Sequence, residues 1–436
     1  MHVLDDPAYT VPTVPPGGTG IAWLRSHVAR FSEGVDHERR RVQAVSLLQD
    51  VDPEKLRKSG HPVSTLAEVL GLRREVACDV EIVAASYQPH DAVTPEADAA
   101  LGRLVGACGG AWDESTAARI GLLVQACAAT RSWIIGNDPP VAATRRVSPS
   151  GDEVLLSLQG MPFGAGRHAC PGETHARALF DGATRFTQLH LGGEPLLVPN
   201  AWDFASAAAL AGQGFSALGT TSLGVAASHG LPDAAGATYA ETVALARSLV
   251  RLPVPVSIDV EGGFGVDPAQ LAGELTMIGV AGINVEDGRG DHLAPVAQQC
   301  ALITAIKAAA PELFVNARVD THWLGVSLPE TTPRAQAYVD AGADGVFVPG
   351  LREASAIGEL VRQLGDTPLN VLAELPFHRL RDLGVRRVST GSLLFRTAIT
   401  QAVAAATAYR DGSTGPQALS YDHIERTRRH ALGEAE

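Results

Sequence analysis

Three apolar stretches of this chain end in side chains that bind cations or anions. The first, Val256–Val260, contains Asp259 and is followed at once by Glu261; the second ends at Glu286, and the third contains Arg318. Asp259 and Glu261 are two residues apart, so on an extended strand both side chains point to the same side. In a parallel barrel, the carboxyl ends of the strands form the face where chemistry takes place. The pattern therefore predicts carboxylates and a guanidinium gathered at one site.

Parallel strands must bring these side chains together, and the second half of the chain contains the pattern for them. Eight apolar runs alternate with amphipathic helical patterns: Leu196–Pro199, Ala217–Ser222, Pro255–Val260, Gly282–Glu286, Leu313–Asp320, Gly345–Pro349, Leu369–Ala373 and Val385–Thr390. Eight strand–helix units in about 230 residues predict a (β/α)8 TIM barrel, an α/β fold. The first ~150 residues have mainly helical periodicity, so we expect a mostly α-helical N-terminal domain before the barrel.

The length of 436 residues is too great for one ordinary hydrophobic core, which predicts more than one domain. We expect a helical domain at 1–180, a linker at 181–194, the barrel at 195–411 and a C-terminal tail at 412–436. The turn-rich residues 137–151, which contain Pro139, Pro140 and Pro149, interrupt the helical pattern of the first domain.

Composition excludes several classes of partner. The formal net charge of −13 at pH 7 argues against nucleic acid. No apolar run approaches the ~20 residues of a membrane span, and the N-terminus lacks the pattern of a signal peptide. The five cysteines are scattered and form no CxxC pair. They indicate reduced thiols in a cytoplasm rather than a disulfide framework or a zinc site.

The barrel half resembles the isocitrate lyase and phosphoenolpyruvate mutase (phosphonomutase) superfamily over residues 186–411. The stretches that carry the resemblance are Pro199–Asp203, Thr220–Gly224, Gly230–Asp233, Asp259–Gly265, Asn284–Asp287, Asn316–Asp320 and Gly345–Gly350. Their order and spacing together are specific. The resemblance implies an enzyme that breaks a C–C or C–P bond through an enolate.

The resemblance also implies roles for individual residues. Asp259 and Glu286 would help to hold Mg²⁺, with Glu261 in the same water network, since magnesium prefers oxygen ligands. The backbone amides of Ser222, Leu223 and Gly224 would bind the substrate carboxylate, and Arg318 would hold a carboxylate or carbonyl oxygen. Asp233 and Asn370 match positions that line the site. The alternative for the charged residues is a network of salt bridges at the barrel mouth.

The loop after Glu286-Asp287 departs from the superfamily. The mutases have a catalytic lysine there and the isocitrate and methylisocitrate lyases a cysteine, whereas this chain reads Gly288-Arg289-Gly290-Asp291-His292-Leu293-Ala294-Pro295. His292 or Asp291 would then serve as the acid–base group. The alternative interpretation is an exposed polar loop without a catalytic role.

A second resemblance lies in the N-terminal half. Phe163, Gly166, His168, Cys170 and Gly172 have the spacing of the haem-binding loop of haem-thiolate monooxygenases, in which the cysteine ligates iron. The Glu-x-x-Arg helix of that family is missing, and the N-terminal half is about half the length that the family's fold requires. We therefore expect a truncated relative of that fold that binds no haem.

These observations predict a Mg²⁺-dependent lyase or decarboxylase that acts on a small 2-oxo or 2-hydroxy acid. Two alternatives remain: haem-thiolate oxidation through Cys170, and a barrel that has lost catalysis and serves as a scaffold. The final helical stretch, residues 392–410, is rich in small residues between Ala402 and Ala408. In the superfamily such helices pair subunits, so we expect a homodimer or homotetramer.

Overall fold

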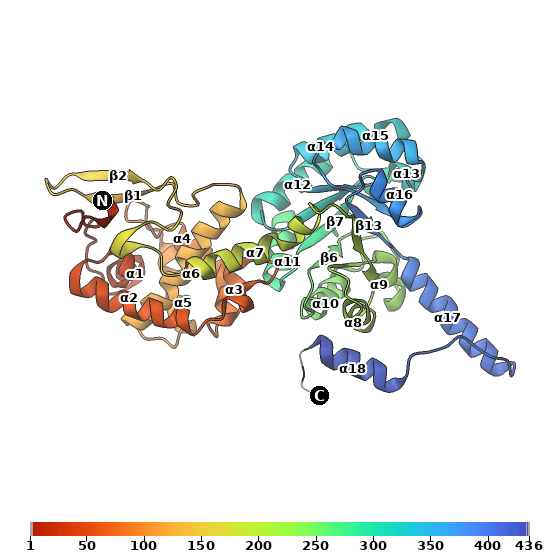
Figure 1. The fold of residues 1–436 in the computed structure, drawn as a ribbon, viewed down its shortest axis with the longest axis horizontal. Helices are drawn as coiled ribbons and strands as arrows, with labels where there is room; N and C mark the ends of the chain where they lie inside the picture. The colour runs from red at the N-terminus through yellow and green to blue at the C-terminus, as the bar shows by residue number, and fades with distance from the viewer. Residues whose placement is uncertain (1–2, 433, 435–436) are drawn as a thin grey trace. The chain divides into compact units, whose positions relative to one another are not determined.

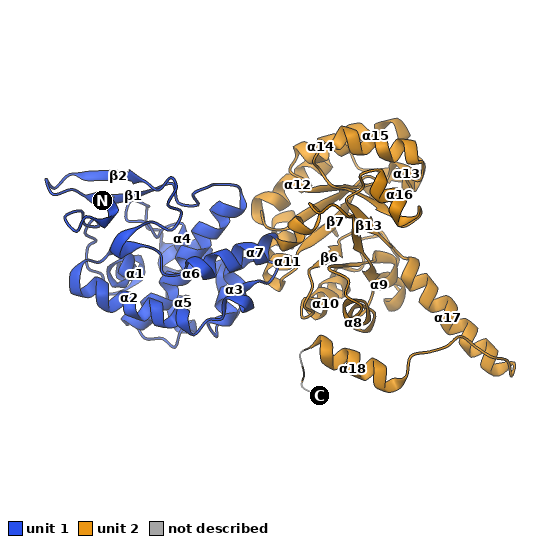
Figure 2. Ribbon diagram, viewed as in Figure 1, with its two compact units in different colours: residues 1–184 blue, residues 185–436 orange. Residues whose placement is uncertain are grey.

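The computed structural model describes residues 3–432 and 434. The chain divides into two compact units, the first ending at Thr184 and the second beginning at Arg185 (Figure 2). The boundary falls inside helix α7, Glu173–Leu189. The sequence predicts a linker at 181–194, but α7 continues through its first part. Leu179, Ala183 and Phe186 are buried at helical spacing, so the helical pattern has no break there.

The N-terminal unit consists mainly of helices. They are α1 (Gly20–His27), α2 (Gly34–Gln49), α3 (Pro62–Val69), α4 (Val76–Ala84), α5 (Pro95–Ala107), α6 (Glu114–Ile134) and the first part of α7, with short 3-10 turns η1 (Val3–Asp5), η2 (Ala29–Phe31), η3 (Pro53–Leu56) and η4 (Gly166–His168). The prediction of a mostly helical N-terminal domain is therefore confirmed.

Local signals set the ends of these helices. Helix α5 begins at Pro95, and the Thr94 hydroxyl caps it by accepting the Ala97 N–H at 3.1 Å. Asp113 caps α6 in the same way, accepting the Thr116 N–H at 2.8 Å. Each cap satisfies a backbone donor that the first turn leaves free.

An antiparallel hairpin, β1 (Ala143–Val147) and β2 (Glu153–Ser157), follows α6. The sequence indicates turns up to residue 151 and gives no strand signal here. The reason is that β1 includes adjacent arginines, Arg145 and Arg146, which obscure the alternation typical of a strand. Within β1 only Arg146 is buried.

The C-terminal unit is built on a parallel sheet. Its strands are β3 (Leu196–Val198), β4 (Asn200–Ala201), β5 (Leu218–Thr220), β6 (Val256–Asp259), β7 (Gly282–Glu286), β10 (Phe314–Arg318), β11 (Gly345–Phe347), β12 (Leu369–Leu372) and β13 (Arg387–Ser389), in the order β3-β13-β12-β11-β10-β7-β6-β5-β4. Strands β3 and β4 belong to one apolar run that Pro199 interrupts. Because β3 pairs with β13 and β4 pairs with β5, the run joins both edges and nearly closes the barrel.

Helices follow the strands around the barrel (Figure 1). They are α8 (Phe204–Gly212), α9 (Ser222–His229), α10 (Tyr239–Leu249), α11 (Pro268–Ile278), α12 (Val296–Ala309), α13 (Thr321–Leu324), α14 (Thr331–Asp340), α15 (Ala354–Leu364), α16 (Phe377–Asp382), α17 (Leu393–Arg410) and α18 (Tyr421–Ala431), with the 3-10 turn η5 (Leu328–Glu330). The (β/α)8 prediction is confirmed. None of the helices described by the structure combines the length and apolarity that crossing a membrane requires.

The apolar core of the barrel lies between the strands and the helices, with Ile258, Ile283 and Val315 fully buried in it. The barrel interior, by contrast, is polar. Arg387 is fully buried there and donates weakly to the Ser257 hydroxyl at 3.3 Å and the Asn284 side chain at 3.2 Å. A polar interior fixes side chains by hydrogen bonds just below the strand ends.

The last two helices differ in how they pack. Helix α17 extends away from the barrel and has no buried residue, so Leu393, Ile399 and Val403 expose apolar surface (Figure 1). Helix α18, in the stretch predicted as a tail, packs against α8. The barrel is therefore partly covered by α18. Helix α17 contacts the barrel through Phe395, whose ring lies 5.4 Å from that of Trp202, and the apolar side chains further along it stay exposed.

Candidate active site

Three neighbouring strands bring charged side chains to one end of the barrel, which we call the mouth (the carboxyl ends of the strands). Strand β6 ends at Asp259, β7 at Glu286 and β10 at Arg318. The register pairs Glu286 with Arg318, and Asp259 with Asn284. The structure therefore brings together the residues that the sequence singles out, on the face where barrels carry their active sites.

Arg318 is held on two sides by carboxylates. Its Nη1 lies 2.6 Å from Glu286 Oε2 and its Nε lies 2.6 Å from Asp320 Oδ1, and all three side chains are nearly buried. The guanidinium also lies over the rings of Trp323 and Phe347, at 5.7 Å and 5.9 Å from their centroids. Burial alone would lower the pKa of Arg318, but these carboxylates raise it, so the arginine is charged and fixed.

Asp259 and Glu286 keep oxygens available at the mouth. Burial raises the pKa of Asp259 and of Glu286, and the nearby Arg318 opposes this shift. Among the described residues, Asp259 Oδ2 and Glu286 Oε1 accept no hydrogen bond, whereas Asp259 Oδ1 accepts the Glu261 N–H at 3.1 Å. Two partly desolvated carboxylates with open oxygens form a donor set suited to a hard cation.

The Glu261 carboxylate binds groups of the protein itself. Its carboxylate accepts the Gly236 N–H at 2.7 Å and the Thr238 hydroxyl at 2.5 Å, and its side chain is buried. Its backbone is in the left-handed region, with φ of 48°. Such a conformation persists only where surrounding contacts hold it. Glu261 thus anchors the loop before α10, and both of its oxygens are engaged within the protein.

A buried network behind the mouth is not apparent from the sequence. Asp287 is fully buried and accepts the Tyr338 hydroxyl at 2.7 Å, the Arg334 guanidinium at 3.1 Å and the Asp320 N–H at 2.8 Å. Asp320 in turn contacts Arg318. The network therefore links α14 to the strand ends and positions the Arg318 guanidinium indirectly.

Helix α9 presents free backbone donors at the mouth. It begins at Ser222, directly after β5, and the N–H groups of Ser222, Leu223 and Gly224 make no hydrogen bond among the described residues. A Cβ at position 224 would approach Trp202 Cβ to 2.8 Å, so a side chain there would disturb the packing of this turn. Three consecutive free N–H groups at a helix start can bind a carboxylate.

The comparison with known families decides where this barrel belongs. The sequence profile described as phosphoenolpyruvate phosphomutase matches residues 186–410 of the chain. The chain belongs to the phosphoenolpyruvate phosphomutase family. The matched range starts inside α7 and ends at the last residue of α17, so it contains the whole barrel and the mouth.

Two curated proteins and one solved structure illustrate what the chain is similar to. An uncharacterized protein of Mycobacterium tuberculosis is 43% identical over 55% of this chain and 94% of its own length. The 2-methylisocitrate lyase of Bacillus subtilis is 31% identical over 47% of this chain and 74% of its own length. The crystal structure of a phosphoenolpyruvate phosphomutase from Streptomyces platensis superposes with a TM-score of 0.52 at 23% identity, covering 57% and 95% of the two chains, which shows a shared fold.

The loop that departs from other members of the superfamily forms a small hairpin, β8 (Gly288–Arg289) with β9 (His292–Leu293). The Arg289 guanidinium pins it by donating to the carbonyl oxygens of Glu286 and Gly262, at 2.8 Å and 3.2 Å. His292 points into solvent, with 71% of its side chain exposed, and contacts Asp291 at 3.2 Å. The structure thus does not bring His292 to the mouth.

The remaining predicted residues lie at different depths. Asp233 is exposed in the loop before α10 and close enough to Asp259 to raise the pKa of that carboxyl. Asn370 is buried in the barrel, donates to the Ser389 hydroxyl at 3.1 Å and has an unpartnered Oδ1. Within residues 3–432 and 434, no group of three His, Cys, Asp or Glu side chains forms a ready metal site. Cys170 belongs to the N-terminal unit.

Proposed function

We propose that the barrel is a carbon–carbon or carbon–phosphorus lyase that acts on a small 2-oxo or 2-hydroxy acid. The observation that carries this proposal is the joint presence, at the mouth, of two open carboxylates, a fixed guanidinium and free helix N–H groups. Asp259 and Glu286 provide the carboxylates, and Arg318 the guanidinium. The relative named as 2-methylisocitrate lyase, at 31% identity, supports the same class of reaction.

The anion-binding groups orient the substrate. The N–H groups of residues 222–224 bind the carboxylate beside the reacting carbon, since no hydrogen-bond acceptor within the described residues engages them. Arg318 binds a second carboxylate or a carbonyl oxygen with its remaining donors. Because Glu286 and Asp320 already fix the guanidinium, little side-chain entropy is lost when the substrate binds. Asp233 and Asn370 complete the lining of the site.

Asp259 and Glu286 would hold Mg²⁺ at this site, with Glu261 contributing at most through a bridging water. The two open oxygens fit an ion that commonly uses one or two carboxylates and keeps several waters. When bound, the ion supplies positive charge that stabilises the negative charge developing on the substrate as the bond breaks. Burial raises the pKa of both carboxyls, and a bound cation would favour their charged forms.

A lyase at this site also needs an acid–base group. His292 is the candidate on the hairpin, with Asp291 as its neighbour, and 71% of its side chain is exposed to solvent. A role for His292 requires the hairpin to turn inward when substrate binds. A pH profile of kcat/KM that is identical in His292→Gln and the parent protein would exclude it.

We also propose that the protein is a homodimer or homotetramer assembled through α17. This helix has no buried residue and exposes Leu393, Ile399 and Val403, a surface that a second copy would cover. We predict that light scattering at micromolar concentration gives at least twice the mass of one chain, and that Val403→Glu shifts it toward the monomer. A monomer in the parent protein would refute this assembly.

A screen of 2-oxo and 2-hydroxy diacids, with and without Mg²⁺, tests the proposed reaction. We expect turnover of at least one compound, detected as a new 2-oxo acid or a lost C–P signal, and its loss when Mg²⁺ is chelated. Gly224→Val should raise KM because the added side chain disturbs the N–H groups of α9. If the whole panel is inert, or if turnover persists without a divalent cation, the barrel does another reaction or serves as a scaffold.

A further inference from the structure

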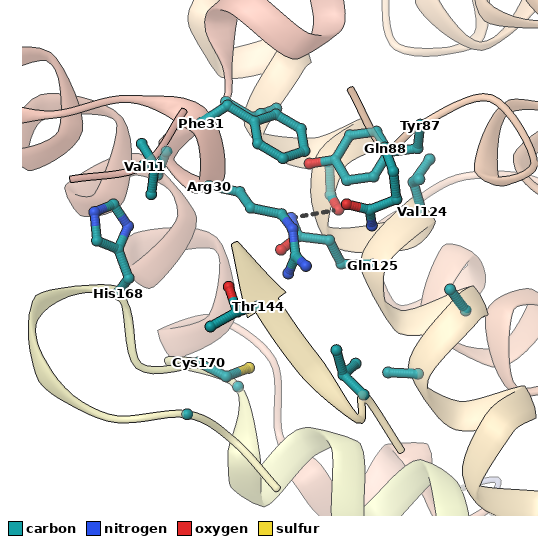
Figure 3. Close-up of a pocket in the computed structure, with 18 of the residues that line it drawn as sticks. Val11, Arg30, Phe31, Tyr87, Gln88, Val124, Gln125, Thr144, His168 and Cys170 are labelled. Carbon is teal, nitrogen blue, oxygen red and sulfur yellow. Dashed lines mark hydrogen bonds between the residues drawn. The ribbon is translucent and has the colours of Figure 1, made fainter. Parts of the chain in front are cut away.

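The N-terminal unit contains a large cavity outside the range that matches the family. Its volume is about 840 Å³, and its walls come from the start of the chain, η2, α6, β1 and the loop before α7. Figure 3 shows Arg30, Thr144, His168 and Cys170 around this space. A cavity of this volume falls in the range of sites for small organic ligands.

One wall of the cavity consists mainly of small and aliphatic residues. Helix α6 contributes Gly121, Leu122, Ala128 and Ala129, and Leu179 of α7 lies on the same lining. Gly121 is needed because a Cβ there would come within 2.9 Å of Val28 Cγ1. Such a wall fits the hydrocarbon or aromatic body of a ligand. Helix α6 also adds the polar side chains Gln125 and Thr130 to the lining.

Another part of the lining carries arginines that form no salt bridge among the described residues. Arg30, Arg41 and Arg146, which we call the arginine cluster, all line the cavity. Among the described residues, none of the three has a carboxylate within salt-bridge distance. Arg146 is only 7% exposed, and its Nη1 donates to the Thr144 hydroxyl and the Arg145 carbonyl, both at 2.8 Å. A nearly buried guanidinium without a counter-charge is costly for a protein to keep.

The nearby acidic groups are already engaged. Glu33 accepts the Val11 N–H at 2.6 Å and pairs with Arg167 at 3.0 Å and His168 at 3.2 Å. Glu153 lies 3.7 Å from Arg145. Neither carboxylate forms a salt bridge with a member of the arginine cluster.

Electrostatic coupling indicates that the members of the cluster act on one part of the cavity. Burial lowers the pKa of Arg146; Glu33 opposes this shift, and Arg30 adds to it. Both Arg30 and Arg41 act on the Cys170 thiol. His168 lies in the same part of the cavity. Burial lowers the pKa of its imidazole to about 4, and the nearby His37 and Arg146 contribute to this shift. The histidine is therefore neutral at pH 7, and the excess charge comes from the arginines.

We propose that this cavity binds an amphipathic organic anion, with an apolar or aromatic body along α6 and a carboxylate, sulfonate or phosphate head at the arginine cluster. The head replaces the counter-charge that the fold lacks, and the body fills the apolar wall. This site lies in a different unit from the mouth of the barrel and does not depend on the reaction proposed there.

Two related fluorescent probes test this site on the full-length protein. Anilinonaphthalene sulfonate carries an aromatic body and one negative charge, and phenylnaphthylamine has the same body without the charge. We expect the sulfonate to bind saturably at one site per chain. In Arg30→Gln and Arg146→Gln its Kd should rise about tenfold, as loss of one charged hydrogen bond predicts. The neutral probe should change less than about twofold.

Two further variants make the test specific. Arg145→Gln removes an arginine of the same lining that already pairs with Glu153, so it should leave both probes unaffected. Ala129→Phe fills the apolar wall and should weaken both probes. Circular dichroism of each variant must match that of the parent protein. Absence of saturable sulfonate binding, equal losses for both probes in Arg146→Gln, or an Arg145→Gln effect as large as that of Arg146→Gln would overturn the proposal.

Discussion

The mouth of the barrel and the cavity of the N-terminal unit differ in whether their arginines are paired with carboxylates. At the mouth, Arg318 lies between Glu286 and Asp320, with both contacts at 2.6 Å. In the cavity, the arginine cluster has no carboxylate partner among the described residues. Paired charges hold a site in shape before the substrate arrives, whereas unpaired charges gain most from an anionic ligand. We infer that the mouth is organised to position a substrate and the cavity to bind an anion.

The largest effect should come from breaking the pairs at the mouth. Arg318→Ala removes the counter-charge of Glu286 and Asp320, both nearly buried, which costs about 3–5 kcal/mol of unfolding free energy. We expect the calorimetric transition of the barrel to shift down and turnover to be lost. The matched control is Arg352→Ala, because Arg352 pairs with Glu374 at 2.8 Å on the surface. That change should cost no more than about 1 kcal/mol.

Equal destabilisation in the Arg318 and Arg352 variants would contradict the first half of the comparison, since it would mean that the mouth gains nothing from its paired charges.

Arg387 of the barrel, unlike Arg318, has no carboxylate partner among the described residues. Arg387 is fully buried, and its Nε and Nη1 have no hydrogen-bond partner. Burial first, and Arg387 second, lower the pKa of His190 to about 3. At pH values between about 3 and the ordinary value of 6.5, His190 binds a proton in the unfolded chain but stays neutral in the folded barrel. Stability is therefore fully present above pH ~6.5 and falls as the pH drops, by up to about 1.4 kcal/mol per pH unit.

His190→Phe should remove this part of the pH dependence. The ring of His190 is stacked on Phe314 at 4.3 Å, so a phenyl ring suits the position, although the bond to the Phe186 carbonyl is lost. The measurement is urea unfolding of parent and variant at several pH values between 6.5 and 4.5. Parallel curves for the two proteins would show that His190 is not the proton acceptor.

The strand ends could be predicted because their signals are local. Asp259, Glu286 and Arg318 each lie at the end of an apolar run, and strand periodicity with barrel topology suffices to bring them together. The free N–H groups of residues 222–224 follow from the same logic, since a helix start after a strand leaves them without partners.

The partners that fix these residues could not be predicted. Tyr338 bonds to Asp287 across 51 residues of sequence. Thr238 engages Glu261 across 23 residues, so a predicted metal-site carboxylate proves to be occupied by a loop. Such contacts depend on how helices pack, for which a single sequence carries no periodic signal. The cavity of the N-terminal unit was missed for the same reason, because its arginines come from separate elements, η2, α2 and β1.

The smallest effect should come from Cys170. This residue lines the cavity, and burial raises the pKa of its thiol, which favours the neutral form over an iron-binding thiolate. We predict a colourless purified protein and unchanged lyase activity in Cys170→Ser. Reconstitution with haemin, followed by the reduced carbon monoxide difference spectrum, checks this. A stoichiometric thiolate-type band that is lost in Cys170→Ser would favour the haem-thiolate alternative.

Calorimetric titration with Mg²⁺ tests the assignment of the mouth most directly. We predict one binding site per chain in the parent protein, and no measurable binding in Asp259→Ala or Glu286→Ala, because each removes one of the two open carboxylates. Both variants should keep the circular dichroism spectrum of the parent, since these side chains lie at the strand ends. Undiminished Mg²⁺ affinity in both folded variants would contradict the account.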